Sequence, residues 1–210
     1  MTSLAIPARR PVLADALAPR LSRAVPSPWL ADVALVLAGT LVVALSAQVT
    51  IPLPIVPITG QTLAVIVVGA ALGSRRGAAA LLTYLAVGLA GAPVFAGLTG
   101  SVAAVMTPSF GFILGFIPAA FVAGWFAERA WDRTPLLALG GFVAASVVPF
   151  LIGVPYMAWI LNGVMGLGYD LAGILAVGVV PFIAGGLVKA GLAALLIPAA
   201  WRLVRRVDER

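Results

Sequence analysis

Lys189 is the residue of this sequence whose type and position are best suited to chemistry with a small solute. It is the single lysine of the chain, and it lies inside a long apolar stretch, eight residues beyond Pro181. An ionisable side chain inside a membrane span generally faces a cavity, a partner or a solute route, although a lysine can also extend to the lipid headgroups. Helical side chains lean toward the helix N-terminus, so Lys189 should reach over Gly186 and Gly185. We therefore expect an ammonium group above an open pocket, where it can bind the carboxylate of a small anionic solute.

Most of the other candidate ligand-binding residues lie in or near two connectors between apolar stretches. Residues 51–57 are rich in proline, which favours an extended strip that serves either as a stiff lid or as a plain linker. Residues 91–110 are rich in glycine, which lets a backbone approach a ligand closely, and aromatic rings there can pack on a flat ligand ring. The polar candidates can also cap helices, and the tyrosine can also be an interfacial aromatic. The candidates are Thr59, Gln61, Tyr84, Phe95, Phe112, Asn162 and Asp170.

The residue composition excludes several other chemistries. The chain has no His and no Cys, so disulfides, thiol catalysis, zinc–thiolate sites and imidazole acid–base catalysis are excluded. The phosphate-binding pattern G-x-x-x-x-G-K-[ST] is absent, so the chain has no ATP site of that kind. Only a serine–lysine pair remains for catalysis, and no motif surrounds Ser46, Ser101 or Ser146. We expect a protein that is not an enzyme and that has no cofactor and no metal site.

The elements that carry these residues are predicted to be membrane helices. Of 210 residues, 62% are hydrophobic and 10% are charged, whereas soluble domains average roughly 25% charged residues. A bilayer core of about 30 Å needs roughly 20 apolar residues per helix. We predict an all-α integral membrane protein, a six-transmembrane-helix bundle whose last span is long enough to contain a break. The spans are predicted at about 29–49, 59–72, 77–89, 111–126, 136–156 and 173–201.

The positions of the basic residues predict how the bundle lies in the cell membrane. Twelve of the thirteen lie in segments 1–28, 73–76, 128–134 and 202–210, and none lies in connectors 50–58, 90–110 and 157–172. Arginine clusters beside apolar spans mark cytoplasmic loops. Both termini are therefore predicted to be cytoplasmic. Residues 1–28 are predicted to form a mobile or surface-lying arm, 29–201 the membrane domain and 202–210 a basic tail.

Small residues spaced four apart predict close helix packing. The pairs are Ala34 and Ala38, Gly69 and Gly73, and Gly111 and Gly115. Close packing within the bundle is the simpler interpretation of all three pairs. A surface for a partner protein is the alternative for the first pair.

Four blocks of sequence resemble the BioY family, in the same order. They are residues 56–63 (VPITGQTL), 73–78 (GSRRGA), 91–96 (GAPVFA) and 181–190 (PFIAGGLVKA), and the likeness covers about residues 29–200. Members of this family are the biotin-binding S components of energy-coupling-factor (ECF) vitamin transporters. The resemblance implies that Lys189 is a ligand-binding residue, and that this chain works with a transmembrane coupling protein and two cytoplasmic ATPases. It also implies that the face carrying Ala34 and Ala38 contacts the coupling protein.

Three positions depart from the pattern of the family. Gly186 stands where the family has an aspartate, Ala184 where it often has a proline, and Gly60 where an apolar residue is more common. A usual polar contact to the ligand is therefore missing, and Asn162 or Asp170 is predicted to replace it.

The resulting expectation is a membrane-embedded biotin-binding subunit that captures biotin from outside and is coupled to an ATP-driven module. Two alternatives stay open. The same architecture could serve a different small anionic vitamin, because the aspartate is missing. A self-sufficient secondary transporter is the other, although paired halves and intramembrane acids are not evident.

Overall fold

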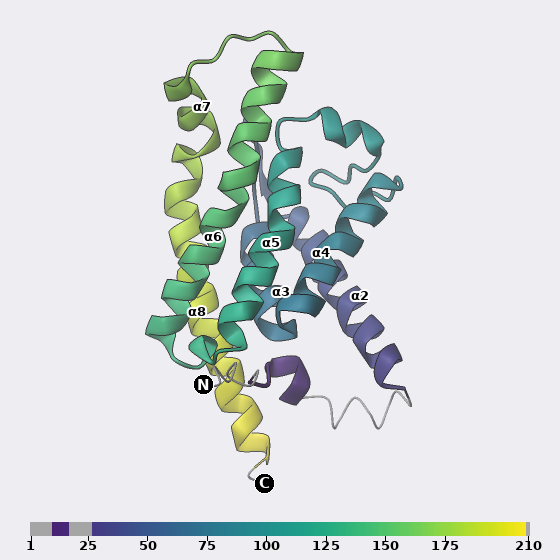
Figure 1. Cartoon of the computed structure of the whole chain (residues 1–210), viewed down its shortest axis with the longest axis vertical. Coiled ribbons are helices and arrows are strands. Elements are labelled where there is room, and N and C mark those ends of the chain that lie inside the picture. Colours follow the sequence, from purple (N-terminus) through teal and green to yellow (C-terminus); the bar gives the residue numbers. More distant parts are fainter. Residues whose placement is uncertain (1–9, 17–26, 209–210) are drawn as a thin grey trace, which may run out of the picture.

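The structure is a computed structural model that describes residues 10–16 and 27–208, with the side chains of 205–208 left out. Helices make up most of it (Figure 1). The long helices are α2 (Pro28–Ala47), α3 (Gln61–Leu72), α4 (Ser74–Leu89), α5 (Phe110–Ala127), α6 (Pro135–Ala158), α7 (Leu171–Gly178) and α8 (Val180–Asp208). Shorter turns are the 3₁₀ helices η1 (Val102–Met106) and η2 (Trp131–Arg133) and the π-helical η3 (Trp159–Val164). The strands β1 (Thr50–Ile51) and β2 (Ile58–Thr59) pair antiparallel.

Four helical segments among the described residues are long and apolar enough to cross a membrane. They are Pro28–Ala47, Phe110–Ala127, Pro135–Val164 and Leu171–Val204, which correspond to the first, fourth, fifth and sixth predicted spans. Helices α3 and α4 have 12 and 16 residues, and at 1.5 Å per residue they reach about 18 and 24 Å. The structure thus supports a multi-pass membrane protein, and the count of six complete spans stays a prediction.

The sixth predicted span is broken, as expected. Helix α7 ends at Gly178 and α8 begins at Val180, so the helical structure is interrupted at Val179. Pro181 follows in the first turn of α8, where its missing N–H costs no helical hydrogen bond. Beyond the break, α8 packs against α6 and α3.

The glycine pairs predicted from spacing lie at helix contacts inside the bundle. A Cβ atom built on Gly69 of α3 would stand 2.4 Å from the carbonyl oxygen of Ala120 in α5. A Cβ atom on Gly115 would stand 2.6 Å from the Cα of Pro149 in α6. The close-packing interpretation is therefore confirmed for these two positions. Ala34 and Ala38 differ, because both are exposed on α2.

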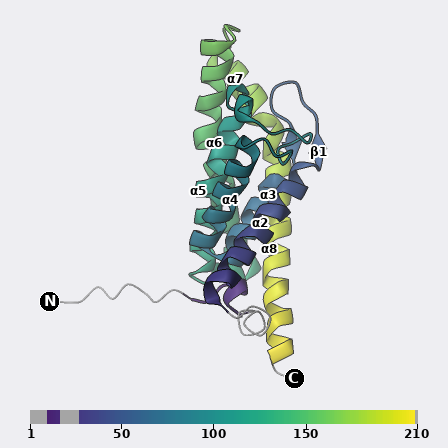
Figure 2. The ribbon, with the colours of Figure 1, turned by 90° about the vertical axis from the view of Figure 1, so that its right-hand side faces the viewer.

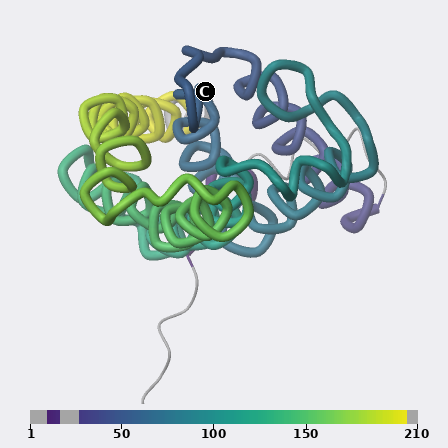
Figure 3. The backbone as a smooth tube through the Cα atoms, turned by 90° about the horizontal axis from the view of Figure 1, so that it is seen from above, coloured from purple at the N-terminus to yellow at the C-terminus, as the bar shows by residue number. Residues whose placement is uncertain are grey.

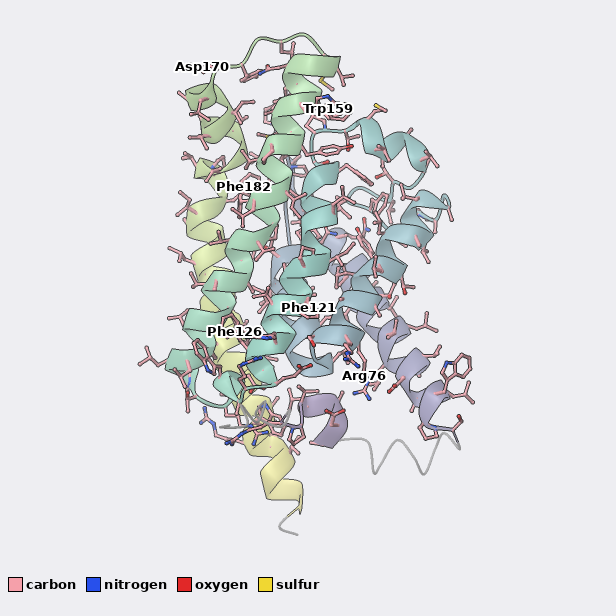
Figure 4. All side chains as sticks on the ribbon, viewed as in Figure 1. Arg76, Phe121, Phe126, Trp159, Asp170 and Phe182 are labelled. Atoms are coloured by element: carbon pink, nitrogen blue, oxygen red, sulfur yellow. The ribbon has the colours of Figure 1, made fainter. Side chains whose placement is uncertain are left out.

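The described arginine-bearing segments meet at one end of the bundle. Arg76 in α4 bridges Asp15 and Asp32, with N–O distances of 2.6 and 2.7 Å. Ser74 donates its hydroxyl to Glu128 at 2.8 Å, which joins α4 to the end of α5. Figure 4 shows Arg76 and Phe126 near this end and Asp170 at the opposite one.

The part of the predicted N-terminal arm that the structure describes is packed against the bundle. Residues 10–16 lie beneath it, the N–H of Arg10 donates to the carbonyl of Glu128, and the side chain of Val12 has no exposed surface. The rest of the arm, 1–9 and 17–26, lies outside the described residues. The predicted basic tail begins as a continuation of α8, which runs to Asp208.

Seen from above, α6, α7 and α8 lie on one side of the molecule and α2 and α4 on the other (Figure 3). The proline-rich connector forms the β1–β2 hairpin, in which Thr50 pairs with Thr59. The hairpin lies in the half of the bundle away from the arginine-bearing end (Figure 2). The glycine-rich connector between α4 and α5 lies in the same half (Figure 1). The two connectors near which most candidate residues lie are therefore in one half of the bundle.

Candidate ligand-binding site

Two adjoining cavities lie where the two connectors meet the helices. The larger, about 570 Å³, is enclosed mainly by α5, the proline-rich connector and residues 95–109. The smaller, about 70 Å³, lies between α5, α6, α8 and the same connector. Five residues line both cavities, namely Val56, Pro57, Thr59, Phe112 and Phe116. The proline-rich connector therefore forms a shared wall.

Lys189 faces the smaller cavity from α8. Its Nζ donates to the backbone oxygen of Thr59 at 2.6 Å and to Oγ1 of Thr62 at 3.0 Å. Gly185 and Gly186 line the same cavity, and a Cβ atom added to either would meet open space. Lys189, Gly185 and Gly186 therefore line one cavity, as their spacing on a helix predicts. Lys189 is the only charged residue among the described residues that line the two cavities.

Aromatic rings form the apolar wall of the smaller cavity. The ring of Phe112 stacks on that of Phe182 at 6.2 Å between centroids and meets Phe150 edge-on at 5.7 Å. Phe112 comes from α5, Phe150 from α6 and Phe182 from α8, whose position Figure 4 shows. These rings bring three helices together beside the ammonium group of Lys189.

Thr59, Gln61, Tyr84 and Phe95 form one connected cluster at the larger cavity. The Thr59 hydroxyl donates to Oε1 of Gln61 at 3.1 Å, and Nε2 of Gln61 donates to the Tyr84 hydroxyl at 2.8 Å. The ring of Phe95 meets that of Tyr84 edge-on at 5.4 Å. Tyr84 is completely buried, so the interfacial interpretation of this residue is wrong. Thr59, Gln61 and Phe95 line the cavity. Tyr84 is not among the lining residues, and it contacts Gln61 and Phe95.

Asn162 and Asp170 lie away from both cavities. The amide of Asn162 donates to the carbonyl of Tyr169 at 2.8 Å and accepts from its N–H at 2.7 Å, which closes the loop between η3 and α7. Asp170 caps α7 by accepting from the N–H of Gly173 at 2.8 Å. Both polar groups serve local backbone structure, so the structure does not bring them to the position left by Gly186. Of the two interpretations that the sequence allows for Asp170, it supports the helix cap.

Several cavity-lining polar residues are not identified by the sequence pattern. Thr62 bonds to Lys189, and Ser146 lines the same cavity while its hydroxyl donates to the carbonyl of Phe142 at 2.7 Å. Thr62 lies within the first of the four blocks, three residues after Thr59, which is a signal that spacing could have used. The larger cavity has four more hydroxyl side chains, those of Thr99, Ser101, Thr107 and Ser109.

Apolar spans around a cavity with one cation define a membrane protein that binds a small solute. The fold agrees with a solved structure of this class, the S-component for biotin from an ECF-type ABC transporter. The two chains superpose with a TM-score of 0.60 over 86% of this chain and 92% of the other, at 21% sequence identity.

This chain belongs to the BioY family, whose family model matches residues 16–206. It is 38% identical to the biotin transporter BioY of Rhizobium etli over 148 residues, which cover 67% of this chain and 75% of that protein. It is 35% identical to the biotin transporter BioY of Thermotoga maritima over 171 residues, which cover 81% and 94% respectively. These relatives are transporters by name, which agrees with the expectation that this chain is not an enzyme.

Proposed function

We propose that this protein is the biotin-binding membrane subunit of a biotin uptake system. The observation that carries the proposal is Lys189, which is the only charged side chain that the described part of the chain contributes to the two cavities. A half-buried ammonium group attracts a ligand carboxylate because less water screens it than at an exposed surface. Biotin has such a carboxylate on an apolar tail, and relatives of this chain are named biotin transporters.

The two cavities match the two ends of biotin. The volume of the larger cavity lies within the range of roughly 300–1,000 Å³ that is typical of small-molecule pockets. Its lining includes Gln61, Phe95 and four hydroxyl groups, which can contact a flat polar ring. The smaller cavity has room only for a small group beside Lys189. We therefore place the bicyclic ring in the larger cavity and the carboxylate in the smaller one, with the tail passing Phe112 and Phe116.

Gly186 gives this site a distinct balance of charge. With glycine in place of the family aspartate, no carboxylate at that position neutralises Lys189, so the full charge acts on the ligand. Thr62 and Ser146 line the cavity around the ammonium group and are better placed than Asn162 or Asp170 to supply the missing polar contact. This assignment favours an anionic ligand, whether biotin or another small vitamin with a carboxylate.

We also propose coupling to an ATP-driven module made of a transmembrane coupling protein and cytoplasmic ATPases. The chain itself lacks the phosphate-binding pattern, and the exposed face of α2 with Ala34 and Ala38 offers a close-packing surface. The arginine-bearing end is placed in the cytoplasm by the positive-inside rule, with both termini on that side. The cavities then lie in the outer half of the bundle.

The test is equilibrium biotin binding to the purified chain. Lys189→Met should weaken binding by about 30-fold or more, since removing one partner of a buried charge pair costs about 2 kcal/mol or more. Arg75→Met, which removes an exposed cation at the far end, should leave binding unchanged. Equal biotin binding by wild type and Lys189→Met would refute the site. Binding of another anionic vitamin in place of biotin would refute the assigned ligand alone.

The energising step is tested in vesicles that contain the chain with or without the coupling protein and ATPases. Uptake that requires these subunits and ATP supports the proposed division of labour. Uptake by the chain alone, driven by a proton gradient, would instead identify a secondary transporter.

A further inference from the structure

We infer that Gln48 is a positioning residue that holds the turn at residues 94–99 closed over the larger cavity, and so controls how fast the ligand enters and leaves. The inference rests on the proposed function, because it takes this cavity as the site of the ligand. Gln48 itself does not line either cavity. Its effect must therefore pass through the turn that it holds.

The side chain of Gln48 joins the end of α2 to this turn with both parts of its amide. Nε2 lies 3.1 Å from the carbonyl oxygen of Phe95 and 3.4 Å from that of Val94. Oε1 accepts from the N–H of Leu98 at 3.0 Å. Nε2 also lies 3.1 Å from the carbonyl oxygen of Ala44 in α2, which anchors the amide to its own helix. A glutamine amide has two donor hydrogens and one acceptor oxygen, and all of them are used here.

The turn needs such an external hold because its own backbone is strained. Gly97 and Leu98 both have positive φ values, 72° and 56°. Glycine adopts this conformation freely, but a leucine does so only at an energetic cost. Within the turn, the N–H of Phe95 donates to the carbonyl of Thr99 at 2.9 Å. Leu98 is 67% exposed, so packing of its side chain contributes little to holding the turn.

The turn is positioned to act as a cover. Phe95, Leu98 and Thr99 line the larger cavity, and so do the next residues, Gly100 and Ser101. The connector is fixed again farther along, where the hydroxyl of Tyr156 in α6 donates to the carbonyl of Val105 at 2.5 Å. Residues 94–99 can therefore swing away while residue 105 stays attached, provided that the hydrogen bonds of Gln48 break and the buried ring of Phe95 leaves its contact with Tyr84.

The same contacts continue to Lys189. They run in sequence from Gln48 to Phe95 (3.1 Å), Tyr84 (5.4 Å between rings), Gln61 (2.8 Å), Thr59 (3.1 Å) and Lys189 (2.6 Å). Gln48 ends α2, the helix whose exposed face is the proposed surface for the coupling protein. A shift of α2 caused by the partner would thus act first on the cover of the cavity.

The first experiment compares the wild type with Gln48→Met, which keeps the length of the side chain and removes its hydrogen bonds. In the ligand-free protein, we expect hydrogen exchange at the amides of residues 95–99 to accelerate about tenfold. The control Ser46→Ala removes a hydroxyl of the same helical turn that bonds only to the carbonyl of Val43, and it should change nothing. Unchanged exchange in a folded Gln48→Met protein would overturn the inference, whether or not the protein binds biotin.

Ligand kinetics separate a cover from a general weakening of the site. Gln48 lines neither cavity, so its bonds do not involve the ligand, and their loss should open the empty and the loaded cavity alike. We expect the association and dissociation rates of biotin both to rise about tenfold, equivalent to about 1.4 kcal/mol, with the Kd changed less than threefold. A weaker Kd with an unchanged association rate would overturn the gating role.

A second variant keeps the test decisive if Gln48→Met does not fold. The chain has no cysteine, so the pair Gln48→Cys and Leu98→Cys can be joined specifically by a short bifunctional thiol reagent with a cleavable linker. Joining them should slow both the association and the dissociation of biotin at least tenfold, and cleavage should restore the rates. Unchanged rates in the joined protein would overturn the inference. Failure of the wild type to bind biotin would refute the proposed function, and the exchange experiment would still decide the role of Gln48.

Discussion

At the scale of single residues, the half-buried Lys189 and the buried Asp132 have opposite surroundings. Lys189 has an open cavity before it and hydrogen bonds to Thr59 and Thr62. Asp132, in the turn between α5 and α6, has no exposed surface. Its Oδ2 accepts from Nε1 of Trp201 at 2.5 Å, while Oδ1 has no hydrogen-bond partner among the described residues. Lys189 thus faces a cavity, whereas Asp132 ties α8 to the arginine-bearing end.

The buried carboxyl of Asp132 predicts a pH-dependent stability. Burial raises its pKa, although the Trp201 hydrogen bond and the charge of Arg133 act in the opposite direction. Below the ordinary value of about 4, the carboxyl is neutral in both the folded and the unfolded protein. As pH rises from there through the raised folded pKa, the folded state is penalised for ionising a buried group. Asp132 therefore costs more stability at pH 7 than at pH 4.

Asp132→Asn tests this prediction, since asparagine keeps an acceptor for Trp201 and cannot ionise. We expect the melting temperature of the variant minus that of the wild type to be higher at pH 7 than at pH 4. The measurement is thermal unfolding in detergent at both pH values. Asp170→Asn, at an exposed helix cap, controls for the loss of a carboxylate in general. The same relative melting temperature at both pH values would contradict the assigned cause.

At the scale of elements, the contact between α3 and α5 depends on the absence of a side chain. A Cβ atom at Gly69 would lie 2.4 Å from a backbone oxygen of α5, which cannot move without its helix. Gly140 in α6 is also helical, but an added Cβ would meet nothing within 4 Å. The two glycines thus form a matched pair, one at a contact and one on an open face.

Alanine substitution should separate these two glycines. Gly69→Ala is expected to destabilise the protein by about 1–3 kcal/mol, as overpacking does. Gly140→Ala is expected to stabilise it by up to about 1 kcal/mol, because alanine is the better helix former. Unfolding in detergent measures both. Equal effects of the two substitutions would show that the helix contact is not as close as described.

At the scale of the whole molecule, one end gathers the arginines and the other half holds the cavities. The structure brings Asp15 to Arg76 and Glu128 to Ser74, although the two members of each pair are far apart in sequence. The α5–α6 turn, in which Thr134 is exposed, lies at this end, and η1, in which Val102 is exposed, lies in the half with the cavities (Figure 1). The positive-inside rule assigns the first end to the cytoplasm.

Single cysteines in this cysteine-free chain test the orientation. In intact cells, Val102→Cys in η1 should react with a membrane-impermeant maleimide. Thr134→Cys in the α5–α6 turn should react only after the cells are permeabilised. The reverse pattern would contradict the predicted orientation while leaving the fold unaffected.

Much of this molecule could be predicted from the sequence because membrane insertion depends on local properties. Runs of apolar residues predicted the bounds of three of the four long spans within about three residues, whereas the fifth predicted span continues to Val164. Pro181 with its surroundings indicated the broken last span. Lys189 above Gly185 and Gly186 follows from helical periodicity alone, because all three lie on one helix face. The family likewise follows from four short blocks in order.

Only the tertiary structure decided which residues meet across the chain. Gln48 contacts a turn nearly fifty residues later, and Tyr84 is buried against Gln61 and Phe95. Asn162 and Asp170 resemble ligand contacts by residue type, yet the structure uses them to close a loop and cap α7. Local patterns fix which face of a helix is apolar, whereas the pairing of polar groups depends on how separate helices pack. That packing is set by small contacts such as Gly69 on Ala120, which no single segment of the sequence specifies.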